Sequence, residues 1–140
     1  MSEEDRLVRA AREARLKAHA PYSDFFVGAA VESVDGEIAV GANMENACYR
    51  LGICAEQSAL AAAAQAFGLD KVARIAIVGG PSGGESAGGP VTPCGGCRQA
   101  IAEAATLAGS DTAILCFDAG GDGRVETSIA QLLPLAFTLE

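Results

Sequence analysis

Two alanine-rich segments, residues 54–67 and 94–109, each begin with a cysteine, and they constrain the fold more than any other feature of the sequence. Alanine has the highest helix propensity, so both segments are predicted to be buried inner helices. Gly68 is typical of the end of the first helix. Strand-like runs precede and follow each segment, which is typical of a fold that interleaves strands and helices.

Five segments are predicted to be strands: residues 25–34, 37–43, 72–80, 112–117 and 123–127. The dipeptide Asp35–Gly36 between the first two is a hairpin signal. The apolar run of the third indicates burial on both faces. Only residues 118–123 join the last two strands, and a parallel pair needs a crossover of about a dozen residues or more, so this pair is expected to be antiparallel.

These elements predict an α/β fold, a three-layer α/β/α sandwich with a five-stranded mixed sheet, formed by a single domain over residues 1–140. A first helix is expected to be capped by Ser2 and ended by Pro21, and a helical turn is expected after residue 128. The Gly/Ser/Pro-rich segment 79–90 is expected to be a mobile surface insertion.

The cysteines are the best candidates for chemistry. The start of the chain does not resemble a secretory signal, so we expect a cytoplasmic protein whose thiols stay reduced. Cys94 and Cys97 fall on one face of a helix that begins there, and Cys54 begins the other inner helix. Helix starts favour thiolates, so the three sulfurs could surround one cation. Three protein ligands plus a water molecule are the pattern of a catalytic zinc site.

The remaining possible ligands fit this zinc site less well. Cys48 and Cys116 are interpreted as small buried residues. His19 is the only histidine, and we expect it at a helix end or on the surface rather than on the metal. One zinc ion per chain is therefore expected, with three thiolate ligands.

Glu56 lies two residues after Cys54, and residues at this spacing share a face only where a helix starts irregularly. A carboxylate near a metal, but not on it, can carry the protons of the reaction. The simpler alternative is that Glu56 only complements the helix dipole. The flanking residues favour the first interpretation, because Cys-Ala-Glu followed by Pro-Cys-x-x-Cys is the signature of zinc deaminases.

The chain resembles the cytidine deaminases, in the short form that assembles as homotetramers. The matching segments are APYSDFFVGAA (20–30), GANMENACY (41–49), CAE (54–56), PCGGCRQ (93–99) and LLPLAF (132–137). The resemblance implies zinc-dependent hydrolytic deamination of free cytidine and 2′-deoxycytidine, in pyrimidine salvage. Glu56 would be the proton shuttle, and the zinc ligands would be Cys54, Cys94 and Cys97.

The resemblance also implies the substrate contacts. Asn43 and Glu45 would bind the ribose hydroxyls, and Phe25 would pack on the pyrimidine. The backbone of Ala55 and Thr92 would contact the edge of the base. Phe137 would reach into a neighbouring subunit's site, so that the active sites of the homotetramer are shared.

One position departs from the family pattern. Many members have arginine directly after Cys-Ala-Glu, where this chain has Gln57. Three thiolates over-neutralise a divalent zinc ion, and nearby positive charge should offset the excess. We therefore expect Arg98, alone or with Arg50, to supply this supporting charge.

Other functions stay open at this point. The same chemistry could act on another aminated heterocycle, such as blasticidin S, or on nucleic acid. A net charge of -8 counts against nucleic acid, and the chain has no apolar run long enough to span a membrane. A zinc module without catalytic activity should have a fourth protein ligand, and a dithiol redox protein using Cys94 and Cys97 should lack zinc.

Overall fold

The computed structural model describes residues 1–139 and contains one five-stranded mixed sheet in the order β2-β1-β3-β4-β5. The strands are β1 (Phe25–Ser33), β2 (Ile38–Ala42), β3 (Val72–Pro81), β4 (Ala113–Asp118) and β5 (Arg124–Ser128). The β3–β4 pair is parallel, and the other neighbours pair antiparallel. The predictions of a mixed sheet and of an antiparallel last pair are confirmed.

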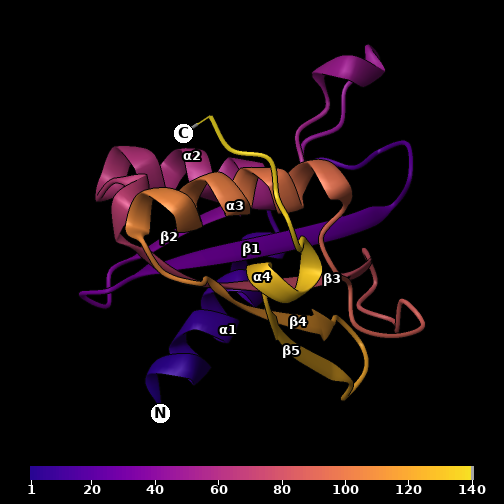
Figure 1. Ribbon diagram of the computed structural model, residues 1–140. Coiled ribbons are helices and arrows are strands. Elements are labelled where there is room, and N and C mark those ends of the chain that lie inside the picture. The colour runs from indigo at the N-terminus through magenta and orange to yellow at the C-terminus, as the bar shows by residue number, and fades with distance from the viewer. Residues whose placement is uncertain (140) are drawn as a thin grey trace.

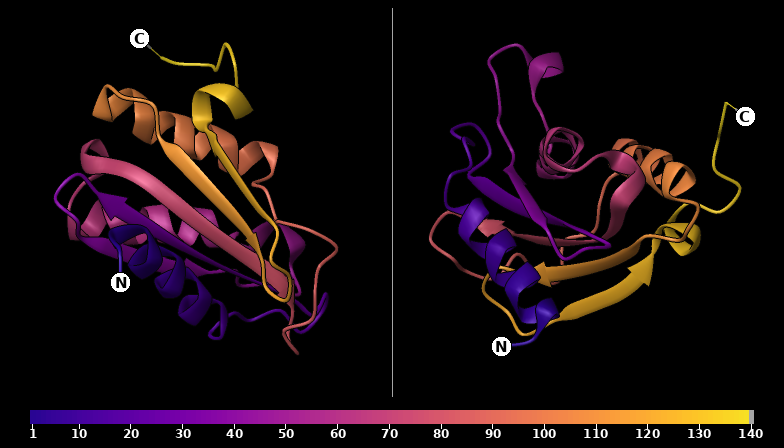
Figure 2. Two further views of the ribbon diagram at one scale, coloured as in Figure 1. Left: turned by 90° about the horizontal axis from the view of Figure 1, so that it is seen from below. Right: turned by 90° about the vertical axis from the view of Figure 1, so that its left-hand side faces the viewer.

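Helices cover both faces of the sheet, so the predicted three-layer α/β/α arrangement is confirmed (Figures 1 and 2). Helix α1 (Glu3–Arg15) lies on one face, and α2 (Ala55–Ala66) and α3 (Gly95–Ala108) lie on the other. The short α4 (Ile129–Leu132) follows β5, and the 3-10 turns η1 (Tyr49–Leu51) and η2 (Leu69–Lys71) lie in connections. Within residues 1–139, no helix is long and apolar enough to cross a membrane.

The central strand β3 separates two hydrophobic cores. Ile75 and Ile77 belong to the core beneath α2 and α3, whereas Ala76 and Val78 belong to the core beneath α1. All four side chains are fully buried. Burial of β3 on both faces, predicted from its continuous apolar run, is therefore confirmed.

Helix α1 begins as the sequence predicts but ends earlier. The Ser2 hydroxyl accepts a hydrogen bond from the Asp5 N–H, and the Asp5 carboxylate accepts one from the Ser2 N–H, which completes a capping box. The expectation that Pro21 ends the helix is wrong, because the last helical residue is Arg15. The chain leaves the helix there, and the backbone of His19 pairs with Asn43 and Glu45 instead.

Segment 79–90 is only partly the surface insertion that we expect from the sequence. Its first residues continue β3 to Pro81, residues 82–88 are exposed, and residues 84–86 pack against the turn that joins β4 to β5. Its mobility stays a prediction. The carboxylate of Asp118 accepts hydrogen bonds from Ser86 and Ala87, which fasten this segment.

Helix α1 packs directly on the backbone of β1 at Gly28. A Cβ atom built on Gly28 would lie 2.1 Å from the Ala11 carbonyl oxygen and 2.5 Å from the Arg15 nitrogen. Gly28→Ala must therefore push α1 off the sheet, and we expect it to lower the free energy of unfolding by at least about 2 kcal/mol. Urea denaturation measures this. Gly95→Ala is the control, because its Cβ would meet no atom within 4 Å; equal losses for the two variants would contradict the direct packing.

Candidate active site

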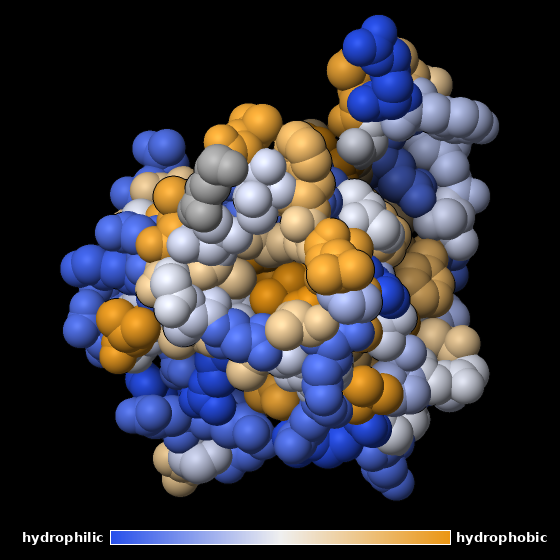
Figure 3. All heavy atoms as spheres, in the orientation of Figure 1, coloured by the Kyte–Doolittle hydropathy of each residue, from blue (hydrophilic) through white to orange (hydrophobic). Residues whose placement is uncertain are grey.

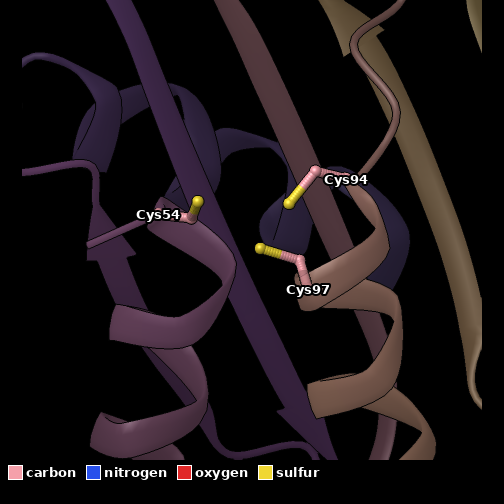
Figure 4. Close-up of side chains that lie close together, drawn as sticks. All are labelled: Cys54, Cys94 and Cys97. Carbon is pink, nitrogen blue, oxygen red and sulfur yellow. The ribbon is translucent and has the colours of Figure 1, made fainter. Parts of the chain in front are cut away.

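The three predicted metal ligands meet where α2 and α3 begin (Figure 4). Cys54 is the N-cap residue of α2, Cys94 is the N-cap residue of α3, and Cys97 lies in the first turn of α3. Their sulfur atoms all lie within 4.8 Å of one another. Both helices direct their positive ends at this point, which favours thiolates there.

The arrangement fits a zinc ion. Zn–S bonds of about 2.3 Å in tetrahedral geometry place sulfurs about 3.8 Å apart, so a small closure of the three cysteines would complete the site. Within residues 1–139, no fourth His, Cys, Asp or Glu side chain joins the group. Three ligands leave one coordination position for a reactant, which is the catalytic pattern rather than the structural one.

The three cysteines of the cluster differ in their exposure to solvent. Cys97 is fully buried, Cys54 is half-buried and Cys94 is exposed. Burial raises the pKa of the Cys54 and Cys97 thiols, while the backbone N–H of Cys97 lowers the pKa of Cys94. The cluster is therefore open to solvent on the Cys94 side.

Glu56 is buried beside the cluster. Its residue is only 5% exposed, although it lies in the first turn of α2 directly after Ala55. Burial raises the pKa of its carboxyl, and hydrogen bonding with its own backbone and the Cys97 thiol partly opposes this rise. A carboxylate that only complemented a helix dipole would lie in solvent, so this burial favours a role next to the metal.

Gln57 is a contact that sequence reasoning missed. Its Nε2 lies 3.7 Å from the Sγ of Cys97, at hydrogen-bonding distance for sulfur. The sequence pointed to this position only as a departure from the family pattern, because a lone glutamine gives no signal of its own. Gln57 thus places a neutral amide donor, without positive charge, beside the cluster.

Arg98 makes different contacts from those its predicted role would suggest. Its Nε donates to the Pro93 carbonyl oxygen at 2.8 Å, and its Nη1 donates to the Leu132 carbonyl oxygen at 3.1 Å. These bonds tie the metal-binding loop to the end of α4. That Arg98 offsets the negative charge of the thiolates stays a prediction.

The predicted ribose contacts lie together at one end of β1 and β2. The Asn43 side chain accepts a hydrogen bond from Val27 N–H and donates one to the Phe25 carbonyl oxygen, both at 2.9 Å. The Glu45 carboxylate accepts hydrogen bonds from the backbone N–H of Tyr22 at 2.9 Å and from the Ser23 backbone and hydroxyl. The Ser23 hydroxyl bond is the main reason why the pKa of Glu45 lies below its usual value.

The other predicted substrate residues differ in their surroundings. Phe25 is half-buried, and Ala55 is fully buried at the first residue of α2. Thr92 is exposed and lies two residues before Cys94. Phe137 is 69% exposed, and its carbonyl oxygen accepts a hydrogen bond from Gln99. The tail thus presents the Phe137 ring outward from its own chain.

The remaining predictions for single residues are partly right. Cys116 is buried as expected, with a pKa raised to about 12 by burial. Cys48 is exposed, so its interpretation as a buried residue is wrong; it caps the exposed turn η1, whose apolar residues do not cover it. His19 is exposed and stays outside the cysteine cluster, as predicted.

An α/β/α sandwich that holds three converging thiolates, one open metal position and a buried carboxylate defines a zinc hydrolase. A family model described as the cytidine and deoxycytidylate deaminase zinc-binding region matches residues 1–108. The chain belongs to this cytidine and deoxycytidylate deaminase family.

Similar proteins cover nearly the whole chain. A cytidine deaminase from Halalkalibacterium halodurans is 43% identical over 96% of this chain and 93% of its own length. One from Sporosarcina psychrophila is 38% identical over 97% of this chain and 92% of its own. The crystal structure of a cytidine deaminase from Burkholderia pseudomallei has a TM-score of 0.83 at 40% identity, covering 98% of this chain and 100% of that one.

Proposed function

We propose that the chain hydrolytically deaminates free cytidine and 2′-deoxycytidine to uridine and 2′-deoxyuridine, with release of ammonia, in pyrimidine salvage. The observation that carries this proposal is the three-cysteine cluster with one open position beside buried Glu56, in a chain of the cytidine deaminase family. The proposed unit is a single catalytic domain over residues 1–140 that binds one zinc ion.

Zinc bound by Cys54, Cys94 and Cys97 would supply an activated water molecule for attack at C4 of the pyrimidine. Glu56 takes a proton from this water and delivers it to the ring nitrogen N3. Glu56 then transfers the second proton to the exocyclic amine, which leaves as ammonia, and the water oxygen remains as the C4 carbonyl. Burial suits Glu56 to this work, because a raised pKa brings a carboxyl closer to the operating pH.

Asn43 and Glu45 fix the nucleoside through its sugar in this proposal. The Asn43 amide is already oriented by two hydrogen bonds to β1, and each of its polar atoms can make one more. The carboxylate of Glu45 is held by the 22–23 backbone and lines a pocket of about 320 Å³ with Tyr22 and Tyr49. An amide and a carboxylate together provide the donor and acceptors that a sugar diol requires.

Glu45→Gln tests the sugar contact. A hydrogen bond to a charged group is worth about 1.5–3 kcal/mol, so we expect KM for cytidine to rise about tenfold with kcat nearly unchanged. Steady-state kinetics of cytidine turnover measure both values. Glu37→Gln is the matched control, because it makes the same change in an exposed carboxylate at the far end of β2, in the 33–37 hairpin. An unchanged KM for Glu45→Gln would remove Glu45 from the substrate site.

We also propose that the chain forms a homotetramer with shared active sites. Segment 43–53 projects from the body with the turn η1 at its tip (Figure 1), and Tyr49 and Leu51 of this turn are exposed. Hydrophobic residues also surround a hollow beside α3 and α4, where a groove of about 400 Å³ lies (Figure 3). With the exposed ring of Phe137, these surfaces support self-association. Light scattering of the purified chain tests the tetramer.

The net charge and the free cysteines support the proposed partner and location of the chain. A small nucleoside fits the acidic chain better than nucleic acid does, because its net charge is -8. Five free cysteines fit a reducing compartment and support a cytoplasmic location.

A panel of substrates tests the proposed activity. Ammonia release is measured with cytidine, 2′-deoxycytidine, cytosine, deoxycytidylate and blasticidin S. The proposal expects rapid release from the two free nucleosides and at least about tenfold lower kcat/KM for cytosine, which lacks the sugar contacts. Release from blasticidin S alone would move the activity to another aminated heterocycle.

A further inference from the structure

Asp118 is a buried carboxylate with no role in the proposed chemistry. It ends β4 and is only 2% exposed. Its Oδ2 accepts a hydrogen bond from the Ser86 hydroxyl at 2.5 Å, and its Oδ1 accepts bonds from the N–H groups of Ala87 at 2.8 Å and Gly120 at 3.2 Å. These bonds hold the pKa of the carboxyl below its usual value, the Ser86 hydroxyl contributing most. One side chain thus joins the end of β4 to a segment more than 30 residues earlier in the sequence.

The backbone packs tightly where Asp118 holds it. A Cβ atom on Gly120 would lie 2.4 Å from the backbone of both Glu85 and Ser86, and one on Gly80 would lie 2.8 Å from the Ala119 side chain. Residues 84–86 therefore lie against the β4–β5 turn without an intervening side chain. Such close contact leaves little room for the segment to shift while the Asp118 bonds are intact.

Arg15 fastens the start of the same segment. Its buried guanidinium donates to the carbonyl oxygens of Gly80, at 3.1 Å, and Pro81, and to that of Phe26 at 3.1 Å. The segment that leaves β3 is therefore held at Gly80 and Pro81 by Arg15, and at Ser86 and Ala87 by Asp118.

The fastened segment leads straight into the metal site. The Val91 N–H donates to the Phe117 carbonyl oxygen at 3.4 Å, directly before Asp118. The Val91 side chain and the Phe25 ring both lie above Gly79, 2.8 Å and 3.3 Å from where its Cβ would be. Thr92 comes next, and Cys94 follows two residues later. A shift at Ser86 would therefore reach a metal ligand and the predicted pyrimidine contact Phe25.

We propose that Asp118 is a positioning residue that, by holding Ser86 and Ala87, fixes segment 82–93 and thereby sets the positions of Thr92 and Cys94. Its effect on zinc depends only on Cys94 being a ligand, whereas its effect on the substrate rests on the proposed function. Asp118 acts through the backbone of this segment and touches neither the metal nor the reacting atoms.

Ser86→Ala tests the contact with the least disturbance, because Ser86 is exposed and contributes one hydroxyl. Zinc release to a chelator should be about tenfold faster from the Ser86→Ala holoenzyme than from the unchanged chain. Tenfold is the lower end of the loss of metal affinity that changes outside the ligand shell cause. KM for cytidine should rise with it. Ser82→Ala is the matched control, since Ser82 lies in the same exposed segment and makes no side-chain hydrogen bond within residues 1–139. Ser86→Thr keeps the hydroxyl and should restore slow zinc release.

Two further variants keep the outcome clear. Asp118→Asn should release zinc at least as fast as Ser86→Ala, and the effects of the two changes should not multiply in the double variant, because both remove the Ser86–Asp118 hydrogen bond. Zinc release from Ser86→Ala at the rate of Ser82→Ala would overturn the proposal, and so would equal effects of Ser86→Ala and Ser86→Thr. If the unchanged chain does not deaminate cytidine, the proposed function fails, while the zinc-release rates still decide the role of Asp118.

Discussion

Glu56→Gln is expected to lower the turnover of cytidine by about 10³-fold or more while one zinc ion stays bound per chain, because general acid–base groups contribute about 10²- to 10⁴-fold and Glu56 serves more than one step. Glutamine has nearly the same shape, so the buried position beside Cys97 stays filled. It cannot exchange protons with the water or the departing amine. Steady-state kinetics and zinc analysis of the same preparation measure the two quantities.

The control for this variant is Glu103→Gln, which makes the same change at an exposed position of α3. It should retain full turnover. If Glu56→Gln also kept its activity, Glu56 would be a structural residue and the proposed chemistry would lose its proton carrier.

Glu56→Gln should also change the pH dependence of stability in the zinc-free protein. Burial raises the pKa of the Glu56 carboxyl above the usual 4.5, so the folded state binds its proton more tightly than the unfolded state. This contribution to stability is present below the usual pKa and is lost as the pH rises through the raised value. Zinc-free Glu56→Gln should therefore gain stability relative to the unchanged chain as the pH rises, which urea denaturation at several pH values measures.

Cys97→Ser is expected to abolish activity by removing the metal. Cys97 is the fully buried member of the cluster, and a serine hydroxyl is a poor ligand for zinc beside two thiolates. Changes outside the ligand shell lower metal affinity by about 10- to 100-fold. Loss of a ligand should lower the zinc affinity by more than this. Zinc titration with a competing chelator measures the affinity, and ammonia release from cytidine measures the activity.

Cys48→Ser is the matched control, because Cys48 is an exposed free cysteine outside the cluster. It should keep both zinc and activity. Full zinc binding by Cys97→Ser would remove Cys97 from the ligand set. For the unchanged chain, zinc affinity should weaken as the pH falls, because the thiols of Cys54 and Cys97 hold their protons tightly and must release them to bind the metal.

Local patterns in the sequence predicted much of this structure. The Asp35–Gly36 turn, the apolar run of β3 and the alanine-rich α2 and α3 each carry their signal within a few residues. The short connection between β4 and β5 was enough to fix their antiparallel pairing. The spacing of the cysteines at two helix starts likewise predicted the cluster that the structure brings together.

Contacts between distant segments could not be predicted in the same way. Asp118 meets Ser86, and Gln57 meets Cys97, only because the sheet order and helix packing bring them together. For the same reason the polar composition of segment 79–90 predicts a surface loop but not its contact with Asp118, because nothing nearby in the sequence indicates a buried carboxylate beneath it. The early end of α1 depends on His19 pairing with Asn43, which is also a long-range contact.

Adding zinc back to metal-free protein tests whether bound zinc is what enables the chain to deaminate cytidine. The chain is freed of metal with a chelator under reducing conditions and titrated with zinc, while bound zinc and uridine formation from cytidine are followed in the same sample. We expect activity to rise in proportion to bound zinc and to level off at one zinc ion per chain. Full activity without zinc, or one tightly bound zinc ion with no uridine formed, would contradict the proposed zinc-dependent deamination.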